Sequence, residues 1–166
     1  NKKQLPDITH FIEELNIMIN LNENLDDEIK NKINNLDRYY EFNINDETKK
    51  KKINYFIENV CYPIVGAIKS NYKLIRPIHL AKELNVNFKS YVDTPNSSSY
   101  PSGTSTALTS IALFVNKLET DNNIKNSNFK KAFDLAYLLR VNGGVHYPSD
   151  ITYGQEVAIH IVDKYL

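Results

Sequence analysis

Three short groups of residues combine cations, small polar residues, a histidine and a carboxylate at fixed spacings. The groups are, in chain order, Lys69 with Arg76-Pro77, then Pro101-Ser102-Gly103-Thr104, then Arg140 with His146 and Asp150. Arginine presents parallel donors that match a tetrahedral oxyanion, and lysine adds a point charge. A glycine at the start of a helix lets the free backbone amides approach an anion. These residue types are those that a phosphoryl-binding site needs.

Each group alone also fits a structural role. Lys69 fits a solvated helix position, and Arg76 fits a cation at a helix C-terminus. Ser102 fits a simple N-cap. Asp150 fits a carboxylate that complements the dipole of the last helix.

The positions of Arg140 and Asp150 on their helices favour a functional role. Arg140 shares a helix face with Phe129, Phe133 and Ala136. Asp150 shares a helix face with Gly154, Val157 and Ile161. A charge on a buried face is costly unless it is paired or used. We therefore expect the two charges to meet near His146, which lies between them on a Gly-Gly-Val loop.

The elements that must position these residues are helices, because apolar residues recur at helical spacing. The first two stripes are Ile8, Phe11, Ile12, Leu15 and Ile19, and Ile53, Phe56, Ile57, Val60 and Ile64. The third, after the Pro-Ser-Gly sequence, is Ala107, Leu108, Ile111, Ala112, Val115 and Leu118.

Two more helices are predicted toward the C-terminus. One carries the Phe129 stripe and ends at a glycine cap, Asn142-Gly143-Gly144. The last begins at Pro148 and is predicted to bury Ile151, Ala158, Ile161, Val162 and Tyr165. Residues 93–99 read as a loop, and no internal repeat or domain linker is evident. We predict an all-α, single-domain helical bundle over residues 1–166.

Composition narrows the class of protein. The chain has 166 residues, 42% of them apolar, which is enough for a core. Lys+Arg and Asp+Glu both number 20, so no overall attraction to nucleic acid or to an acidic membrane is expected. The single Cys61 excludes a disulfide framework and a multi-cysteine zinc site. The longest apolar run, Ile111 to Val115, is far below the ~20 residues of a membrane span, so we expect a soluble chain.

Taken together, the three groups resemble the ordered motifs of the type 2 phosphatidic acid phosphatase superfamily, which includes class A acid phosphatases and vanadium haloperoxidases. The family has a Lys and an Arg-Pro six residues apart, a Pro-Ser-Gly-His, and an Arg, His and Asp separated by five and three residues. The resemblance spans about residues 60–163, the motif-bearing core. Residues 1–45 form a predicted helical segment without a motif.

The resemblance implies a metal-independent phosphatase or diphosphatase with a family-like helical bundle. Lys69, Arg76, Ser102, Gly103 and Arg140 would then bind the phosphate. His146 would be the nucleophile that forms a phosphohistidine, and Asp150 would fix its tautomer. No metal or cofactor is implied, although vanadate would bind as a phosphate mimic.

One departure from the family pattern bears on catalysis. Thr104 stands where the family has the histidine that protonates the leaving oxygen, and a threonine hydroxyl is too weak an acid for that step. The chain should therefore be slow on alkyl phosphates and less impaired with good leaving groups. His79, after Arg76-Pro77, is a candidate substitute acid and equally fits a surface position. Leu139 replaces a frequent family serine, a change expected to affect packing only.

Three functions follow from these alternatives. The first is the phosphatase, the second is a degenerate phosphate-binding module that has lost the acid, and the third is a vanadate-dependent haloperoxidase. The expected partner is a phosphorylated small molecule or a lipid head group, without nucleic acid or a membrane span, and the resemblance weakly favours a homodimer. The sequence starts with Asn1, which is consistent with a cytoplasmic chain or with export after removal of an N-terminal segment.

Overall fold

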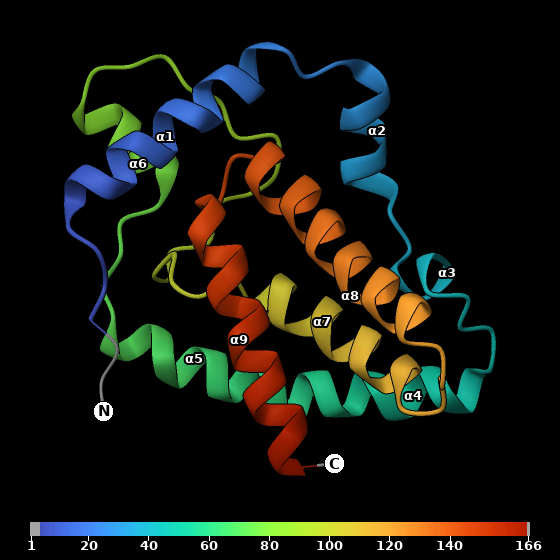
Figure 1. The fold of residues 1–166 in the computed structure, drawn as a ribbon. Helices are drawn as coiled ribbons and strands as arrows, with labels where there is room; N and C mark the ends of the chain where they lie inside the picture. Colours follow the sequence, from blue (N-terminus) through green and yellow to red (C-terminus); the bar gives the residue numbers. More distant parts are fainter. Residues whose placement is uncertain (1–3, 166) are drawn as a thin grey trace.

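The computed structural model describes residues 4–165 and contains α-helices, two π-helical stretches and no strand within that range (Figure 1). The first half comprises α1 (Ile8–Glu23), α2 (Asp27–Asn35), α3 (Arg38–Glu41), α4 (Glu47–Phe56), η1 (Ile57–Cys61), α5 (Tyr62–Asn71) and α6 (Pro77–Glu83). The second half comprises α7 (Gly103–Asn116), α8 (Asn122–Ala136), η2 (Tyr137–Asn142) and α9 (Pro148–Tyr165). The prediction of one all-helical domain is confirmed. Residues 1–3 and 166, which the predicted 1–166 domain includes, lie outside the described residues.

Side-chain caps define where several helices begin. Asp7, Asp26, Asp46 and Asp121 each accept a hydrogen bond from a backbone N–H in the first turn of α1, α2, α4 and α8. Ser102 does the same for α7. Because the first backbone N–H groups of a helix lack intrahelical partners, these caps fix the start of each helix.

The centre of the fold is α7, which packs against both α8 and α9 (Figure 1). Small residues allow the crossing of α7 and α9 to be close. A Cβ added to Gly154 would lie 2.5 Å from the carbonyl oxygen of Ser102. The Thr106 hydroxyl donates to the Gly154 carbonyl over 2.9 Å, and the Ser105 hydroxyl donates to that of Ile151 over 2.6 Å. The N-terminal ends of α7 and α9 are therefore tied together.

The continuous rod α4–η1–α5 packs against α7 (Figure 1). Of its predicted stripe, Ile53 and Ile57 are buried, whereas Phe56, Val60 and Ile64 are half-buried. The rod ends at Asn71, so that Lys69 stands in its last turn. An extended segment then leads to Arg76 at the start of α6.

Three residues at the ends of predicted apolar stripes are exposed. Ile8 is 51% exposed, Leu118 82% and Tyr165 54%. Ile8 is the first residue of α1, Leu118 lies beyond the end of α7, and Tyr165 is the last residue of α9. The prediction that Tyr165 is buried is wrong, because this residue stands at the end of its helix. Val162, which was also predicted to be buried, is half-buried, whereas Ile151, Ala158 and Ile161 are buried as predicted.

The N-terminal segment packs against the loop that carries His146. The Phe11 ring of α1 lies against the Tyr147 ring, with centroids 5.0 Å apart. The buried Glu14 carboxylate accepts hydrogen bonds from the backbone N–H of Ser149 at 2.8 Å and from the Ser149 hydroxyl at 2.8 Å. Glu14 thus caps the first turn of α9 from another helix, where a negative charge is favourable.

We predict that Glu14→Ala lowers the free energy of unfolding by about 1–3 kcal/mol, because it leaves the backbone N–H and the hydroxyl of Ser149 without their acceptor. Urea denaturation checks this value. Glu13→Ala removes an exposed carboxylate from the neighbouring position and should change stability by less than about 0.5 kcal/mol. Equal effects of the two substitutions would contradict the capping role.

Candidate functional site

Most of the predicted site residues line one cavity of about 340 Å³. It is lined by Tyr62, Val65, Gly66, Lys69, Arg76, Pro95, Ser97, Gly103, Thr104, Arg140 and His146. The lining therefore takes residues from α5, the loop before α7, the start of α7 and η2. Residues from all three sequence groups meet here. The lining contains three cations and no carboxylate.

His146 lies between a cation and a carboxyl group. The Arg76 Nη1 atom lies 3.0 Å from His146 Nε2, and His146 Nδ1 lies 3.1 Å from Asp150 Oδ2. A guanidinium group can only donate, so in this arrangement Nε2 accepts and the ring proton lies on Nδ1. That proton is donated to Asp150. That contact uses the single lone pair of Nε2, so this nitrogen becomes a free nucleophile only when Arg76 Nη1 releases it.

The environment of His146 disfavours its protonated form. Burial lowers its pKa well below the usual value, and the nearby charges of Arg76, Lys69 and Arg140 lower the pKa further. His146 is therefore neutral at neutral pH. A neutral imidazole is the form that can act as a nucleophile.

Asp150 is completely buried behind His146. Its Oδ2 atom accepts hydrogen bonds from the Ser99 hydroxyl and from the Tyr147 backbone N–H, the latter at 3.0 Å. Burial raises the pKa of Asp150 to about 8, whereas these hydrogen bonds oppose the rise. The carboxyl group orients the imidazole and does not line the cavity.

Arg76 is held rigidly by the loop that precedes α7 and by the backbone beside His146. Its Nε donates to the Ser97 carbonyl at 3.0 Å and its Nη2 to the Ser97 hydroxyl at 3.2 Å. Its Nη1 also donates to the Val145 carbonyl at 2.9 Å. Burial lowers the pKa of Arg76 to about 10, so the group is charged at neutral pH. The alternative of a cation at a helix C-terminus is wrong, because Arg76 immediately precedes α6.

Arg140 reaches the cavity from the π-helical end of α8. A π-helical stretch inserts a residue into the helix and is frequent at functional sites. Arg140 Nε donates to the Thr104 hydroxyl at 2.7 Å. The chain then turns toward His146 through Gly144, whose φ of 86° favours glycine. A Cβ there would also lie 2.9 Å from the Lys89 carbonyl oxygen.

Lys69 lines the cavity from the last turn of α5, where it is half-buried. Burial lowers its pKa, and so do the charges of Arg76 and Arg140. Together they bring the pKa to about 8. Gly103, the first residue of α7, also lines the cavity.

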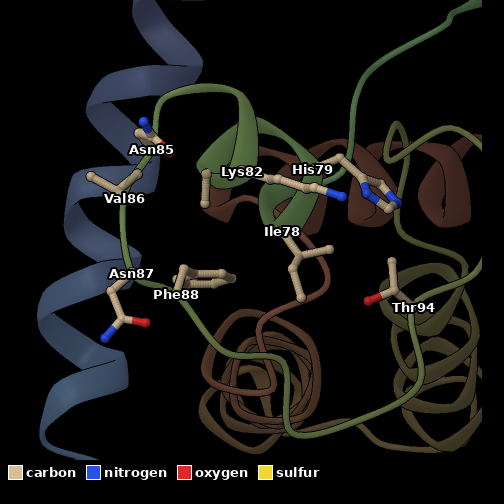
Figure 2. Close-up of a pocket in the computed structure, with 9 residues that line it drawn as sticks. Ile78, His79, Lys82, Asn85, Val86, Asn87, Phe88 and Thr94 are labelled. Carbon is tan, nitrogen blue, oxygen red and sulfur yellow. The ribbon is translucent and has the colours of Figure 1, made fainter.

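Ser102 and His79 lie outside this cavity lining. The buried Ser102 hydroxyl accepts from the Ser105 N–H at 3.1 Å, so it caps α7. His79 is exposed on α6. Figure 2 shows it in a different hollow of about 640 Å³, together with Lys82 and Thr94. His79 also lines a cavity of about 470 Å³ that shares Lys69, Arg76, Pro95 and Ser97 with the first, so it lies next to the candidate site without lining it.

Sequence reasoning missed Ser97 and Ser99, which hold Arg76 and Asp150. They lie in the stretch predicted as a loop, and the run of serines at 97–99 was the available signal. Within residues 4–165, no cluster of three or more His, Cys, Asp or Glu side chains is arranged to hold a metal ion. Nor does any helix in that range have the length and apolar character to cross a membrane.

Comparison with models of known protein families and with curated proteins yields no match for this chain. The geometry of the site is therefore the basis for assigning a function.

Proposed function

We propose that this chain is a metal-independent phosphatase or diphosphatase of the type 2 phosphatidic acid phosphatase kind, with His146 as its nucleophile. The observation that carries the proposal is the line of contacts from Arg76 through His146 to Asp150 at a cavity lined by cations. An oxyanion in this cavity would meet three positive side chains. It would also lie beside the only imidazole in the lining.

Substrate binding follows from the charges. Arg76, Arg140 and Lys69 would donate to the phosphoryl oxygens, and Gly103 would let the substrate approach the first amides of α7. Fixed donors are effective because they need no rearrangement when charge develops in the transition state. A bound dianion would also relieve the mutual repulsion of the three cations.

The first chemical step is attack by His146 Nε2 on phosphorus, after Arg76 Nη1 has turned from Nε2 to an oxygen of the bound phosphoryl group. The P–N bond forms as the P–O bond breaks, and the bonding electron pair leaves with the departing oxygen. The positive charge that develops on the imidazole strengthens its Nδ1–H bond to Asp150. Water then attacks the phosphohistidine, the P–N bond breaks, and the products are orthophosphate and neutral His146. The proton released by the water passes to solvent.

The departing oxygen receives no proton from the side chain at position 104. The Thr104 hydroxyl already accepts from Arg140 Nε, and a hydroxyl has too high a pKa to protonate an alkoxide. Leaving groups that are stable as anions, such as a phosphate or an aryl oxide, are therefore favoured.

A phosphate-release panel of alkyl esters, aryl esters and anhydrides tests the proposal. We expect release from the aryl ester and the anhydride, and a fall of at least about 10³-fold in kcat with His146→Ala. His160→Ala, at an exposed position on α9, is the matched control and should retain activity. Phosphate release that survives His146→Ala undiminished would refute the proposal.

The second candidate is a phosphate-binding module without turnover, and Thr104 is the observation that favours it. The substitution Thr104→His separates the two candidates. For an enzyme we expect a gain of about 10²–10⁴-fold on alkyl esters and a much smaller gain on anhydrides. Thr104→Ser should give no gain. Tight binding of phosphate or vanadate with no turnover by the wild-type chain would favour the module.

The lowered pKa of Lys69 predicts a pH dependence of anion binding. Because its pKa is about 8, the ammonium group is charged below that pH and neutral above it. Calorimetry with sulfate, whose charge is constant near neutral pH, should show affinity falling about 10-fold or more as pH rises from about 7 to about 9. An anion bound to Lys69 raises the pKa in the complex, so the affinity starts to fall near the pKa of the free site and keeps falling until the pKa of the complex is reached.

Two variants control this measurement. Lys69→Gln should bind sulfate weakly at every pH and lose most of the dependence, and the ionisation of Asp150, whose pKa is also about 8, accounts for the remainder. Lys117→Gln, at an exposed position beyond the C-terminal end of α7, should retain the dependence of the wild type. A wild-type affinity that is constant across the range would contradict a binding role for Lys69.

A further inference from the structure

A second cavity, of about 480 Å³, adjoins the first at position 104. The two cavities share Tyr62, Thr104 and Arg140 in their linings. The second adds Arg38 and Tyr39 from α3, together with Leu108 and other residues. A ligand that extends past Thr104 from the first cavity would therefore enter the second.

Arginine is used sparingly in this chain, and every arginine lies at these two cavities. The sequence contains 17 lysines and three arginines, which are Arg38, Arg76 and Arg140. Arg76 lines the first cavity, Arg140 lines both, and Arg38 lines the second. Guanidinium groups bind phosphate with two parallel donors, whereas lysine contributes a point charge. The concentration of arginine here points to a second anionic group in the second cavity.

Arg38 is held in place at the wall of this cavity. Its Nη2 donates to Asn54 Oδ1 at 3.0 Å, and its guanidinium carbon lies 5.3 Å from the centre of the Tyr39 ring. Asn54 belongs to α4 and Tyr39 to α3, so two elements fix the group. The group is half-buried, which strengthens its interaction with an anion.

The one acidic residue of this lining, Asp37, caps a helix. Its carboxylate accepts hydrogen bonds from the backbone N–H groups of Tyr39 at 2.9 Å and Tyr40 at 3.3 Å, as the cap of α3. On the shared wall, the Tyr62 ring packs beside the start of α7, where a Cβ on Gly103 would lie 3.7 Å from Tyr62 Cε1. Tyr62 therefore belongs to the wall that the two cavities share.

We propose that the second cavity holds the leaving group and that Arg38 binds a phosphate there, which makes the substrate a diphosphate. This inference rests on the proposed phosphatase function. The terminal phosphoryl group would lie on Lys69, Arg76 and Arg140, and the leaving phosphate would lie beyond Thr104 against Arg38.

The chemistry of a diphosphate suits a site without an acid. His146 Nε2 attacks the terminal phosphorus, and the bond from that phosphorus to the bridging oxygen breaks. The electron pair stays on the bridging oxygen, which leaves as part of a phosphate anion. Such an anion needs no proton from position 104, whereas an alkoxide does. Water then cleaves the P–N bond and regenerates His146.

Binding of two non-hydrolysable phosphonates tests the subsite without requiring turnover. Calorimetry compares methylenediphosphonate, which fills both cavities, with methylphosphonate, which fills only the first. We expect the wild-type chain to bind the diphosphonate at least about 10-fold more tightly, the effect of one charge-assisted contact. Equal affinities in the wild type overturn the proposal without any variant.

Arg38→Gln should remove most of this preference, and Arg38→Lys should restore part of it because the charge returns. Lys117→Gln removes an exposed lysine beyond the other end of α7 and should keep the preference. Thermal unfolding of each variant checks that it is folded. If Arg38→Gln does not fold, the wild-type preference and its partial loss in Arg38→Lys decide the question. A folded Arg38→Gln that keeps the whole preference overturns the proposal.

Turnover distinguishes this inference from the proposed function. We expect Arg38→Gln to lower, by about 10-fold or more, the ratio of kcat/KM for diphosphate to that for phenyl phosphate. Inorganic diphosphate and a nucleoside diphosphate serve as separate arms, and the faster one shows whether the leaving phosphate carries an organic group. An unchanged ratio in an active enzyme overturns the subsite alone. Absence of turnover on every substrate overturns the phosphatase, and the phosphonate preference still decides the subsite.

Discussion

The arrangement of this site depends on the hydrogen-bonded line that joins Arg76, His146 and Asp150. A buried guanidinium beside an imidazole is tolerated only if the imidazole is neutral, and the neutral ring needs an acceptor for its remaining proton. Asp150 supplies that acceptor from the first turn of α9. Each member therefore constrains the next. The result is a ring nitrogen that is unprotonated and faces a cavity lined by cations.

Contacts elsewhere in the fold hold Arg76, His146 and Asp150 in these positions. Gly154 allows α9 to touch the start of α7, and this contact places Gly103 and Thr104 opposite Arg140. Glu14 holds the first turn of α9 from α1. The N-terminal segment, which carries no motif, therefore contributes to the site by fixing the helix on which Asp150 stands. Stability and the geometry of the site depend on the same contacts here.

The sequence allowed the long helices to be predicted, because apolar spacing within a helix is a local property, whereas the short helices α2, α3 and α6 were not predicted individually. It did not predict the partners that arrive from distant loops. Ser97 and Ser99 bind Arg76 and Asp150 through contacts whose sequence separation leaves no periodic signal. Ser102 was predicted to bind the phosphate, whereas in the structure its hydroxyl makes a local contact, the cap of α7. Arg38 lay in a segment without a motif, and only its position beside Thr104 gives it a role.

The cations of the two cavities set a limit on what can bind there. Lys69, Arg76 and Arg140 face one another without a carboxylate in the cavity lining, and their repulsion contributes to the lowered pKa of Lys69. This arrangement costs stability unless an anion is bound, as is typical of sites organised for function. Because Asp150 is directed to His146, it leaves most of the positive charge of the lining unbalanced. A neutral ligand would leave that repulsion in place, whereas a multiply charged oxyanion removes it, and this difference in free energy is the physical basis of selectivity at the site.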